Sequence, residues 1–223
     1  MVPIRENLVP KDKYAIKCPY TRTPTRVVIH NTANDAPAAN EISYMRYNDL
    51  EISFHYAVDD VNIVQGIPEN RNAWASGDGH GKGNMEGIHI EICYSKSGGE
   101  KFDKAEQNAA EFTASLLKKY GWGIDKVTKH RDYDGKYCPH RTLDRGWQRF
   151  LSMVKRYMKP AKAPVASKFT PYLIRKNCRD ALNIRKGPST NYGILGQIKD
   201  TLRYTIVEER SGPGSHNGWG RLK

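Results

Sequence analysis

The segment KPAKAPVASK at residues 159–168 constrains the fold of this chain more than any other feature. It offers few large apolar side chains to bury, and its two prolines restrict the backbone. We interpret it as a linker between a domain over residues 1–158 and a smaller domain over residues 169–223. At roughly 100–200 residues per domain, a chain of 223 residues has room for both.

The composition excludes several classes of protein. With 38% hydrophobic and 27% charged residues, the chain is neither disordered nor fibrous. Its mean hydropathy is −0.72 and no run approaches ~18 consecutive apolar residues, so we do not expect a membrane protein. The N-terminal segment MVPIRENLVPKDKYAIKCPY carries charges throughout and lacks the apolar core of a secretory signal. We therefore expect synthesis in the cytoplasm without export by a signal peptide.

Positive charge is concentrated in the last third of the chain. The formal net charge is +12, and residues 160–223, with 12 Lys/Arg against 4 Asp/Glu, contribute +8 of it. A basic surface attracts polyanions, which include nucleic acids and anionic cell-wall polymers. Because no nucleic-acid recognition motif accompanies the charge, we do not expect a nucleic-acid partner.

Strand and helix patterns alternate in the first domain, which predicts an α/β fold. Runs of β-branched or alternating apolar residues predict strands at 26–30, 52–60 and 87–95. The third strand would place Ile88, Ile90 and Ile92 on one face and His89, Glu91 and Cys93 on the other.

Three helices are also predicted in this domain. A helix over 103–121 would begin with a capping box of Asp103 and Glu106 and stop at Gly121. Its apolar stripe consists of Ala105, Ala109, Phe112, Leu116 and Tyr120. A second helix would begin at Asp144 and bury Trp147, Phe150 or Leu151, Val154 and Met158. A shorter helix is expected over about 39–47.

The second domain has a different pattern. Its short runs ALNIRKG, YGILGQI and RYTIVEER are separated by turn residues at 187–188 and 211–214. This spacing predicts a small all-β barrel. The sequence stops at GWGRLK, abruptly for a closing strand, and leaves open whether the domain is truncated.

The segment HRDYDGKYCPH at residues 130–140 holds candidate metal ligands. A turn at Asp134-Gly135 would allow His130 and Cys138 to face one ion, and imidazole and thiolate are preferred ligands of zinc. His30, at the end of a buried strand, is the best third candidate. Four cysteines are too few for a disulfide scaffold, which leaves one available as a ligand. The spacing is not that of a zinc finger, so purely structural roles also stay open.

A resemblance to a known family covers about residues 5–158. The chain resembles zinc-dependent N-acetylmuramoyl-L-alanine amidases of type 2, relatives of peptidoglycan recognition proteins, in the ordered segments VVIHNTAND, SFHYAVDD, NAWASGDGHGKGN, IHIEICYS and KHRDYDGKYCPHR. It looks most like catalytic domains of endolysins from phages and prophages of Gram-positive bacteria. The resemblance implies a central mixed β-sheet flanked by helices. It also implies hydrolysis of the amide between N-acetylmuramic acid and the L-alanine of the stem peptide.

The resemblance assigns roles to five residues of the candidate site. Zinc would be held by His30, His130 and Cys138, with water or the substrate carbonyl oxygen in the fourth position. Glu91 would act as general base and then acid, and Lys136 would stabilise the oxyanion. Without the resemblance, a salt-bridged surface carboxylate and a solvated lysine are the simpler interpretations of the last two.

Substrate contacts are expected from the residues that line the same cleft, namely Asn31, Thr32, Phe54, His55 and Trp74. Some family members use a tyrosine as the acid/base, but Phe54 has no hydroxyl, which favours Glu91 in this chain. The glycine-rich loop over 74–84 would form a cleft wall. A structural role beside the metal is the alternative for His55, and a place in the core is the alternative for Trp74.

The second domain resembles bacterial SH3-like (SH3b) cell-wall-binding domains in ALNIRKGPSTNYGILGQI and GWGRLK. The resemblance implies that it holds a monomeric enzyme on peptidoglycan and associated wall polymers, without membrane insertion. A domain that only adds stability is the alternative. An endolysin of this kind would wait in the host cytoplasm until a holin opens the membrane.

Two rival functions use the same residues. One is a non-catalytic peptidoglycan-binding or sensing protein, and the other is a zinc peptidase with a different specificity within peptidoglycan. Non-catalytic relatives typically lose a zinc ligand, commonly the cysteine. The presence of Cys138 therefore favours catalysis.

Overall fold

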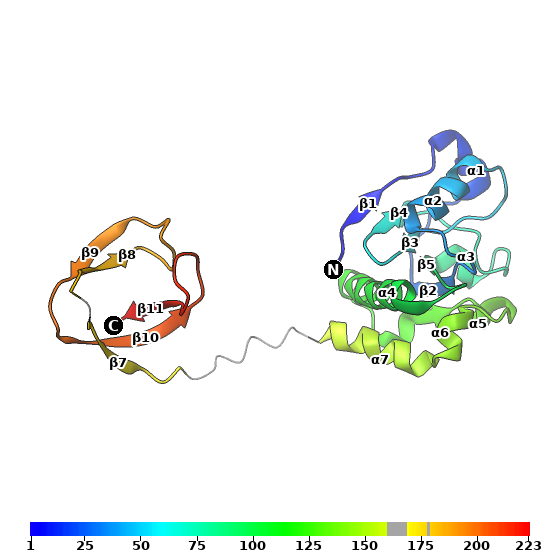
Figure 1. Ribbon diagram of the computed structural model, residues 1–223. Helices are drawn as coiled ribbons and strands as arrows, with labels where there is room; N and C mark the ends of the chain where they lie inside the picture. The colour runs from blue at the N-terminus through cyan, green and yellow to red at the C-terminus, as the bar shows by residue number, and fades with distance from the viewer. Residues whose placement is uncertain (160–168, 178) are drawn as a thin grey trace. The chain divides into compact units, whose positions relative to one another are not determined.

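The structure is a computed structural model that describes residues 1–159, 169–177 and 179–223 (Figure 1). The chain separates into two compact units, Met1–Ala161 and Lys162–Lys223. The linker predicted at 159–168 lies outside the described residues except for Lys159, whose extended backbone follows the last helix of the first unit. In the part of the chain that the structure describes, no helix combines the length and apolar character needed to cross a membrane.

A six-stranded sheet forms the centre of the first unit. Its strands are β1 (Ile4–Glu6), β2 (Arg26–Asn31), β3 (Tyr56–Val58), β4 (Ile63–Gln65), β5 (Gly87–Ile92) and β6 (Val127–Lys129). They lie in the order β1-β4-β3-β5-β2-β6. β3 and β4 pair antiparallel, and every other neighbouring pair is parallel. The predicted mixed sheet is therefore confirmed.

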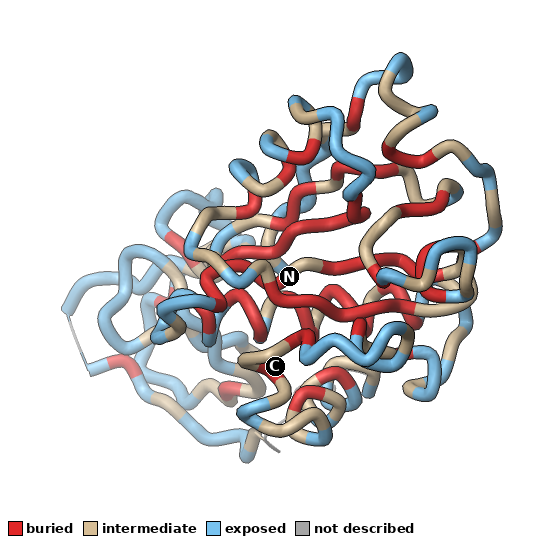
Figure 2. Tube along the Cα trace, turned by 90° about the vertical axis from the view of Figure 1, so that its right-hand side faces the viewer, coloured by how far each residue is buried: buried red, intermediate tan, exposed pale blue. Residues whose placement is uncertain are grey.

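Helices flank this sheet, as predicted. They are α1 (Tyr14–Lys17), α2 (Ala38–Tyr47), α3 (Lys82–Glu86), α4 (Gly99–Tyr120), α5 (Arg131–Asp134), α6 (His140–Asp144) and α7 (Trp147–Met158), with 3₁₀ turns η1 (Lys11–Lys13) and η2 (Ile124–Lys126). α4 contacts β3, β5 and α7, whereas α2 contacts β3 and β4. Figure 2 shows the buried strands passing through the middle of the unit, with exposed segments around them.

The two faces of the sheet carry different chemistry. Tyr56 of β3 is the register partner of Ile90 of β5, and its ring meets Phe112 of α4 edge-on at 4.6 Å between centroids. This face is the apolar one that α4 covers. His30 of β2 pairs in register with Glu91 of β5. Because side chains alternate between the faces of a strand, these two polar residues share the opposite face.

α4 confirms the helix predicted over 103–121, but it begins earlier. It starts at Gly99, so Asp103 and Glu106 lie inside the helix and the predicted capping box is wrong. Both carboxylates bind Arg145 instead, at 2.6 Å and 3.3 Å. The acidic residues therefore join α4 to the segment before α7 and do not cap a helix N-terminus.

Glycines end α4 and set the start of α7. α4 stops as predicted at Gly121, whose φ of +68° is the left-handed conformation that favours glycine. The helix predicted from Asp144 begins at Trp147, because Asp144 ends α6 and Gly146, at φ +99°, separates the two helices. Within α7, Phe150 and Val154 are buried as predicted, whereas Trp147, Leu151 and Met158, which were also predicted to face the core, are half-buried.

Two further predictions differ in extent from the structure. α2 spans Ala38–Tyr47, close to the predicted 39–47. The strand predicted over 52–60 is shorter, since only Tyr56–Val58 form β3. Asp59 then closes a turn toward β4 because its Oδ1 accepts hydrogen bonds from the next backbone N–H groups, Val61 at 2.8 Å and Asn62 at 2.6 Å.

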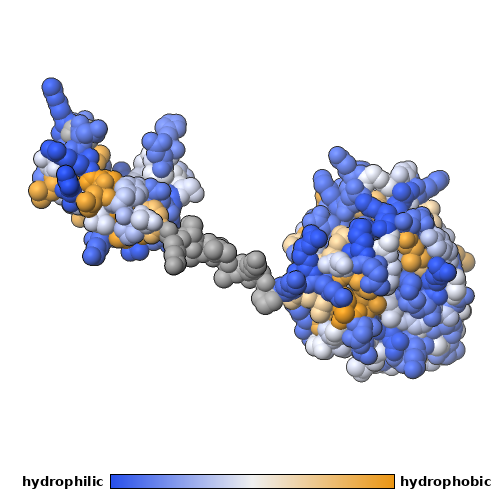
Figure 3. All heavy atoms as spheres, turned by 90° about the horizontal axis from the view of Figure 1, so that it is seen from below, coloured by the Kyte–Doolittle hydropathy of each residue, from blue (hydrophilic) through white to orange (hydrophobic). Residues whose placement is uncertain are grey.

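The second unit is all-β, as predicted. Its strands are β7 (Tyr172–Arg175), β8 (Leu182–Arg185), β9 (Ile194–Ile198), β10 (Arg203–Arg210) and β11 (Trp219–Leu222). They form a three-stranded sheet, β11-β10-β7, and a β8-β9 hairpin. Among its described residues, the buried hydrophobic ones are Ile198 and Ile206, and several large apolar residues are exposed. Figure 3 shows such hydrophobic residues on its surface.

Candidate active site

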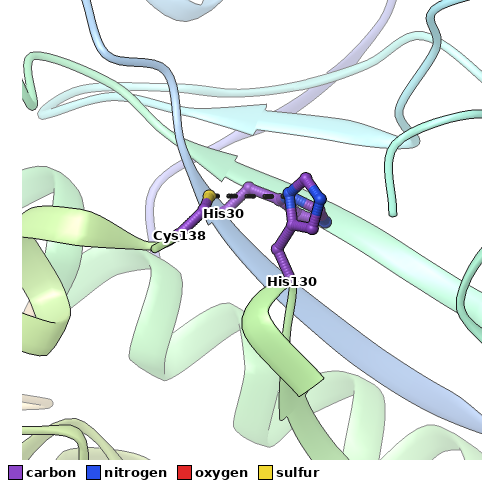
Figure 4. Close-up of side chains that lie close together, drawn as sticks. All are labelled: His30, His130 and Cys138. Atoms are coloured by element: carbon purple, nitrogen blue, oxygen red, sulfur yellow. Dashed lines mark hydrogen bonds between the residues drawn. The ribbon is translucent and has the colours of Figure 1, made fainter. Parts of the chain in front are cut away.

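Three side chains from separate parts of the chain meet on the polar face of the sheet. His30 lies near the end of β2, His130 directly follows β6, and Cys138 precedes α6. Figure 4 shows the three side chains pointing toward one another. Their ligand atoms all lie within 4.8 Å of one another, and all three residues are buried. The structure thus brings together the three residues that the sequence named as candidate metal ligands.

The chain reversal expected at Asp134-Gly135 places His130 and Cys138 side by side. α5 ends at Asp134, and Gly135 follows with φ +81°, a left-handed conformation that glycine adopts without strain. The backbone N–H of Arg131 donates to the carbonyl of Cys138 at 3.0 Å. This hydrogen bond closes the loop that carries both ligands.

The donor set fits a tetrahedral zinc ion. With Zn–N bonds of about 2.0 Å and Zn–S of about 2.3 Å, tetrahedral angles separate two nitrogens by about 3.3 Å and a nitrogen and a sulfur by about 3.5 Å. In the structure, His30 Nδ1 lies 3.2 Å from His130 Nδ1 and 4.0 Å from Cys138 Sγ. Two neutral imidazoles and one thiolate would supply three of the four ligands of a tetrahedral zinc ion, which leaves one coordination position open.

The electrostatic environment keeps both histidines neutral. Burial lowers the pKa of His30 well below its ordinary value, and neighbouring His89, His130 and Lys136 lower it further. Burial also lowers the pKa of His130, although Asp134 opposes this shift. Metal ligation requires an unprotonated imidazole nitrogen, so these shifts favour ligation.

Burial, followed by the charge of Glu91, raises the pKa of the Cys138 thiol to about 12. A divalent cation at this position would favour the thiolate and so oppose the shift. The cysteine is therefore suited to bind a metal and poorly suited to act as a free nucleophile.

Glu91 faces the ligand cluster. Its Oε1 lies 4.0 Å from His30 Nδ1, and its Oε2 is buried without a hydrogen-bond partner among the described residues. Burial, with the charge of Glu41, raises its pKa to about 8, while Lys136 opposes the shift. A buried carboxyl oxygen with no protein partner is available to a water molecule or a substrate.

A cleft of about 1120 Å³ opens above these residues. Glu91 and Lys136 line it, as do four of the predicted substrate contacts, namely Asn31, Thr32, Phe54 and Trp74. The predicted wall over 74–84 is confirmed, because the glycine-rich loop contributes Gly77, Gly79, His80 and Asn84.

Some of these side chains already bind protein groups. The amide of Asn31 donates to the Thr142 hydroxyl at 3.3 Å, and its oxygen accepts from the Thr142 backbone N–H at 3.2 Å. Asn31 therefore ties β2 to α6, the helix that follows Cys138. The indole of Trp74 is half-buried and donates to the carbonyl of Ile16 at 3.0 Å, which fixes the ring at the edge of the cleft.

His55 is fully buried and does not line the cleft, which corrects the prediction that it contacts substrate. Its Nδ1 accepts a hydrogen bond from the His89 backbone N–H at 3.0 Å, so the neutral ring carries its proton on Nε2. That nitrogen donates to the Arg71 carbonyl at 2.9 Å. The structural alternative for this residue is the one that the structure supports.

Two residues of this region were not predicted from the sequence to belong to the site. Glu41 of α2 lines the cleft with a buried Oε1 that lacks a described hydrogen-bond partner. A lone glutamate in a short helix offers no pattern that would separate it from a solvated one. His89 was placed on the same face as Glu91, but only the pairing of β5 with β2 reveals that it contacts His30.

Comparison with known proteins agrees with this geometry. Residues 20–141 match the family model described as N-acetylmuramoyl-L-alanine amidase. The N-acetylmuramoyl-L-alanine amidase XlyB of Bacillus subtilis (strain 168) is 51% identical over 181 residues, which cover 78% of this chain and 57% of XlyB. The amidase CwlA of the same strain is 50% identical over 190 residues, covering 81% of this chain and 70% of CwlA.

The fold agrees as well. The solved structure of PlyL is 53% identical and superposes with a TM-score of 0.67, covering 68% of this chain and 96% of PlyL. The chain spans little more than half the length of XlyB, so the similarity concerns part of that relative. From the matched segments, the mixed sheet and the clustered ligands, we conclude that this chain belongs to the N-acetylmuramoyl-L-alanine amidase family.

Proposed function

We propose that the first unit hydrolyses the amide bond between N-acetylmuramic acid and the L-alanine of the stem peptide in peptidoglycan. The observation that carries this proposal is the buried cluster of His30, His130 and Cys138 beside a carboxyl oxygen of Glu91 that has no hydrogen-bond partner in the described part of the chain. Relatives that share about half of their aligned residues with this chain bear the name of this activity.

Different residues of the chain perform different steps of the proposed hydrolysis. Zinc held by the three ligands would act as a Lewis acid on the attacking water and on the lactyl carbonyl. Glu91 takes the proton of that water and passes it to the departing amine. Its pKa of about 8 makes both protonation states accessible near neutral pH. Lys136 directs its ammonium toward the negative charge that develops on the carbonyl oxygen.

The cleft provides the surfaces for the glycan and the peptide. Trp74 offers an apolar face on which a sugar ring or peptide can pack, and Thr32 offers a hydroxyl, whereas Phe54 lines the cleft but is only 7% exposed. Because Asn31 is bound to Thr142, we assign it to holding the loop that carries Cys138.

The second unit would hold the enzyme on the wall, as an SH3b-like domain does. Support comes from a cleft of about 770 Å³ whose lining includes Trp219 and the cationic residues Arg185 and Lys186, together with Arg210 and Arg221, which pair with Glu208 of the same lining. Such a lining suits the anionic polymers of Gram-positive walls. In this proposal the enzyme is a monomer, kept in the host cytoplasm until a holin opens the membrane.

Mass analysis of digested walls tests the proposal. Purified Gram-positive walls should yield free muramic lactyl carboxyls paired with new N-terminal alanine, and a chelator should abolish both products. Released D-amino acid ends would identify a zinc peptidase instead. Wall binding without any product would identify a non-catalytic binding protein.

A further inference from the structure

The ligand His30 has a second buried histidine on the side away from the other ligands. Its Nε2 lies 2.9 Å from Nδ1 of His89, while its Nδ1 faces His130 and Cys138. His30 is 1% exposed and His89 is 0% exposed, so water does not compete for this contact. The ring centroids are 5.2 Å apart, with 45° between the ring planes.

The direction of this hydrogen bond follows from the tautomers. A neutral imidazole that offers Nδ1 to a metal keeps its single proton on Nε2. The Nε2–H of His30 must then donate, and Nδ1 of His89 must accept. We infer that His89 is a positioning residue that fixes the tautomer and ring orientation of His30 for metal binding. This inference rests on the zinc site of the proposed function.

A comparable contact holds the other ligand histidine. Nε2 of His130 lies 3.0 Å from Oδ2 of Asp134, so both ligand rings face the metal position with Nδ1 and are anchored through Nε2. Such outer hydrogen bonds set the orientation and basicity of metal-bound histidines. His30 differs from His130 in having a neutral acceptor in place of a carboxylate.

His89 is itself held rigidly. Its ring stacks on His55 with 5.6 Å between centroids and 14° between planes, and its backbone N–H donates to Nδ1 of His55 at 3.0 Å. These two contacts with His55 fix the position of the acceptor nitrogen, Nδ1 of His89, relative to β2. This explains why two histidines that do not line the cleft are buried beneath the candidate site.

Three substitutions of His89 distinguish the effect of its hydrogen-bond acceptor, Nδ1, from the effect of the volume of its ring. Asparagine places its amide oxygen close to the position of Nδ1, glutamine reaches toward Nε2, and leucine removes polarity. In the full chain, we expect His89→Leu and His89→Gln to weaken zinc binding about 10–100-fold in competition with a chromophoric chelator. His89→Asn should stay within about threefold of wild type. Cobalt(II) spectra should change in the first two variants only.

His55→Leu is the matched control, because His55 is equally buried and stacks on His89 without contacting a ligand. It should lower the melting temperature and weaken zinc binding much less than His89→Leu does, because it loosens the support of His89 but keeps the Nδ1 acceptor. The inference is overturned if His89→Leu and His89→Gln bind zinc as wild type does, or if the asparagine variant, folded, fails as badly as they do. Should wild type itself not bind zinc, the proposed metal site fails first. If wild type binds zinc and the His89 variants bind it with the same affinity, the metal site stands and only the proposed role of His89 is refuted.

Discussion

At the scale of the residue, burial explains the proposed chemistry of Glu91. Burial, with the charge of Glu41, raises its pKa to about 8, and its Oε2 has no hydrogen-bond partner among the described residues. Glu91→Gln keeps the size of the side chain and removes its basicity. We expect unchanged zinc content, because the carboxylate is not among the three ligands, and a loss of kcat of about 100-fold or more. Metal analysis and turnover on a soluble muropeptide check this; wild-type turnover would refute the proton transfer.

Cys138 supports a second prediction at this scale. Replacing its sulfur by a hydroxyl removes the one anionic ligand, so Cys138→Ser should lower zinc affinity and turnover together, each by roughly 10-fold or more. Cys18→Ser is the control, since Cys18 is also fully buried but lies outside the cleft. It should retain its zinc. If Cys138→Ser bound zinc with the same affinity as the control Cys18→Ser, Cys138 would be excluded as a ligand.

At the scale of the element, the glycine-rich loop touches the group that anchors His130. Gly77 has φ +68°, and a Cβ there would lie 2.2 Å from Oδ2 of Asp134. Gly77→Ala should displace that carboxylate and lower zinc affinity several-fold. Gly79→Ala tests backbone strain alone, because Gly79 also has a positive φ but no described atom lies within 4 Å of its added Cβ. The same loss of zinc in both variants would show that strain, and not contact with Asp134, is responsible.

Glu69 joins two elements on the other side of the unit. It accepts hydrogen bonds from the Tyr56 hydroxyl on β3 at 2.5 Å, from Lys119 Nζ on α4 at 2.6 Å and from the Tyr120 hydroxyl. Burial alone would raise its pKa, but these hydrogen bonds lower it below the ordinary 4.5. The stability supplied by the ionised form is therefore present above pH 4.5 and lost as the pH falls through the folded-state pKa.

The prediction from this linkage is a pH-dependent difference between variants. Glu69→Gln should lower the free energy of unfolding by about 1–3 kcal/mol at pH 7, and the difference should shrink by pH 3. Chemical denaturation at both pH values measures it. Asp125→Asn, at an exposed carboxylate, should change stability by less than about 0.5 kcal/mol at either pH. A difference for Glu69→Gln that persists unchanged at pH 3 would contradict the argument.

At the scale of the whole molecule, chemistry and wall attachment are assigned to separate units. PlyL, which aligns over 96% of its length, corresponds to 68% of this chain. A chain ending at Lys159 should therefore keep its turnover on soluble muropeptides. On intact walls it should act about 10-fold more slowly at low enzyme concentration, because attachment raises the local concentration of cleavable bonds. Equal rates on walls would assign the second unit a purely stabilising role.

Features that depend only on residues close to one another along the chain could be predicted from the sequence. The alternation along β5, the stop of α4 at Gly121 and the turn at Gly135 all arise within a few residues of chain. The family segments also pointed to the three candidate ligands, whose side chains the structure clusters. The predicted start of α4 was wrong because a side chain has a distant partner. Glu106 resembled part of a helix cap, but its carboxylate binds Arg149 at 2.6 Å.

The sequence by itself determined the α/β pattern, the all-β second unit and the identity of the candidate ligands, because local periodicity and motif segments encode them. Only the tertiary structure decided that His55 lies beneath the cleft, that His89 anchors His30 and that Glu41 lines the cleft. These facts depend on strand register and helix packing, which bring residues together across long stretches of chain. No local pattern specifies which distant atoms will meet.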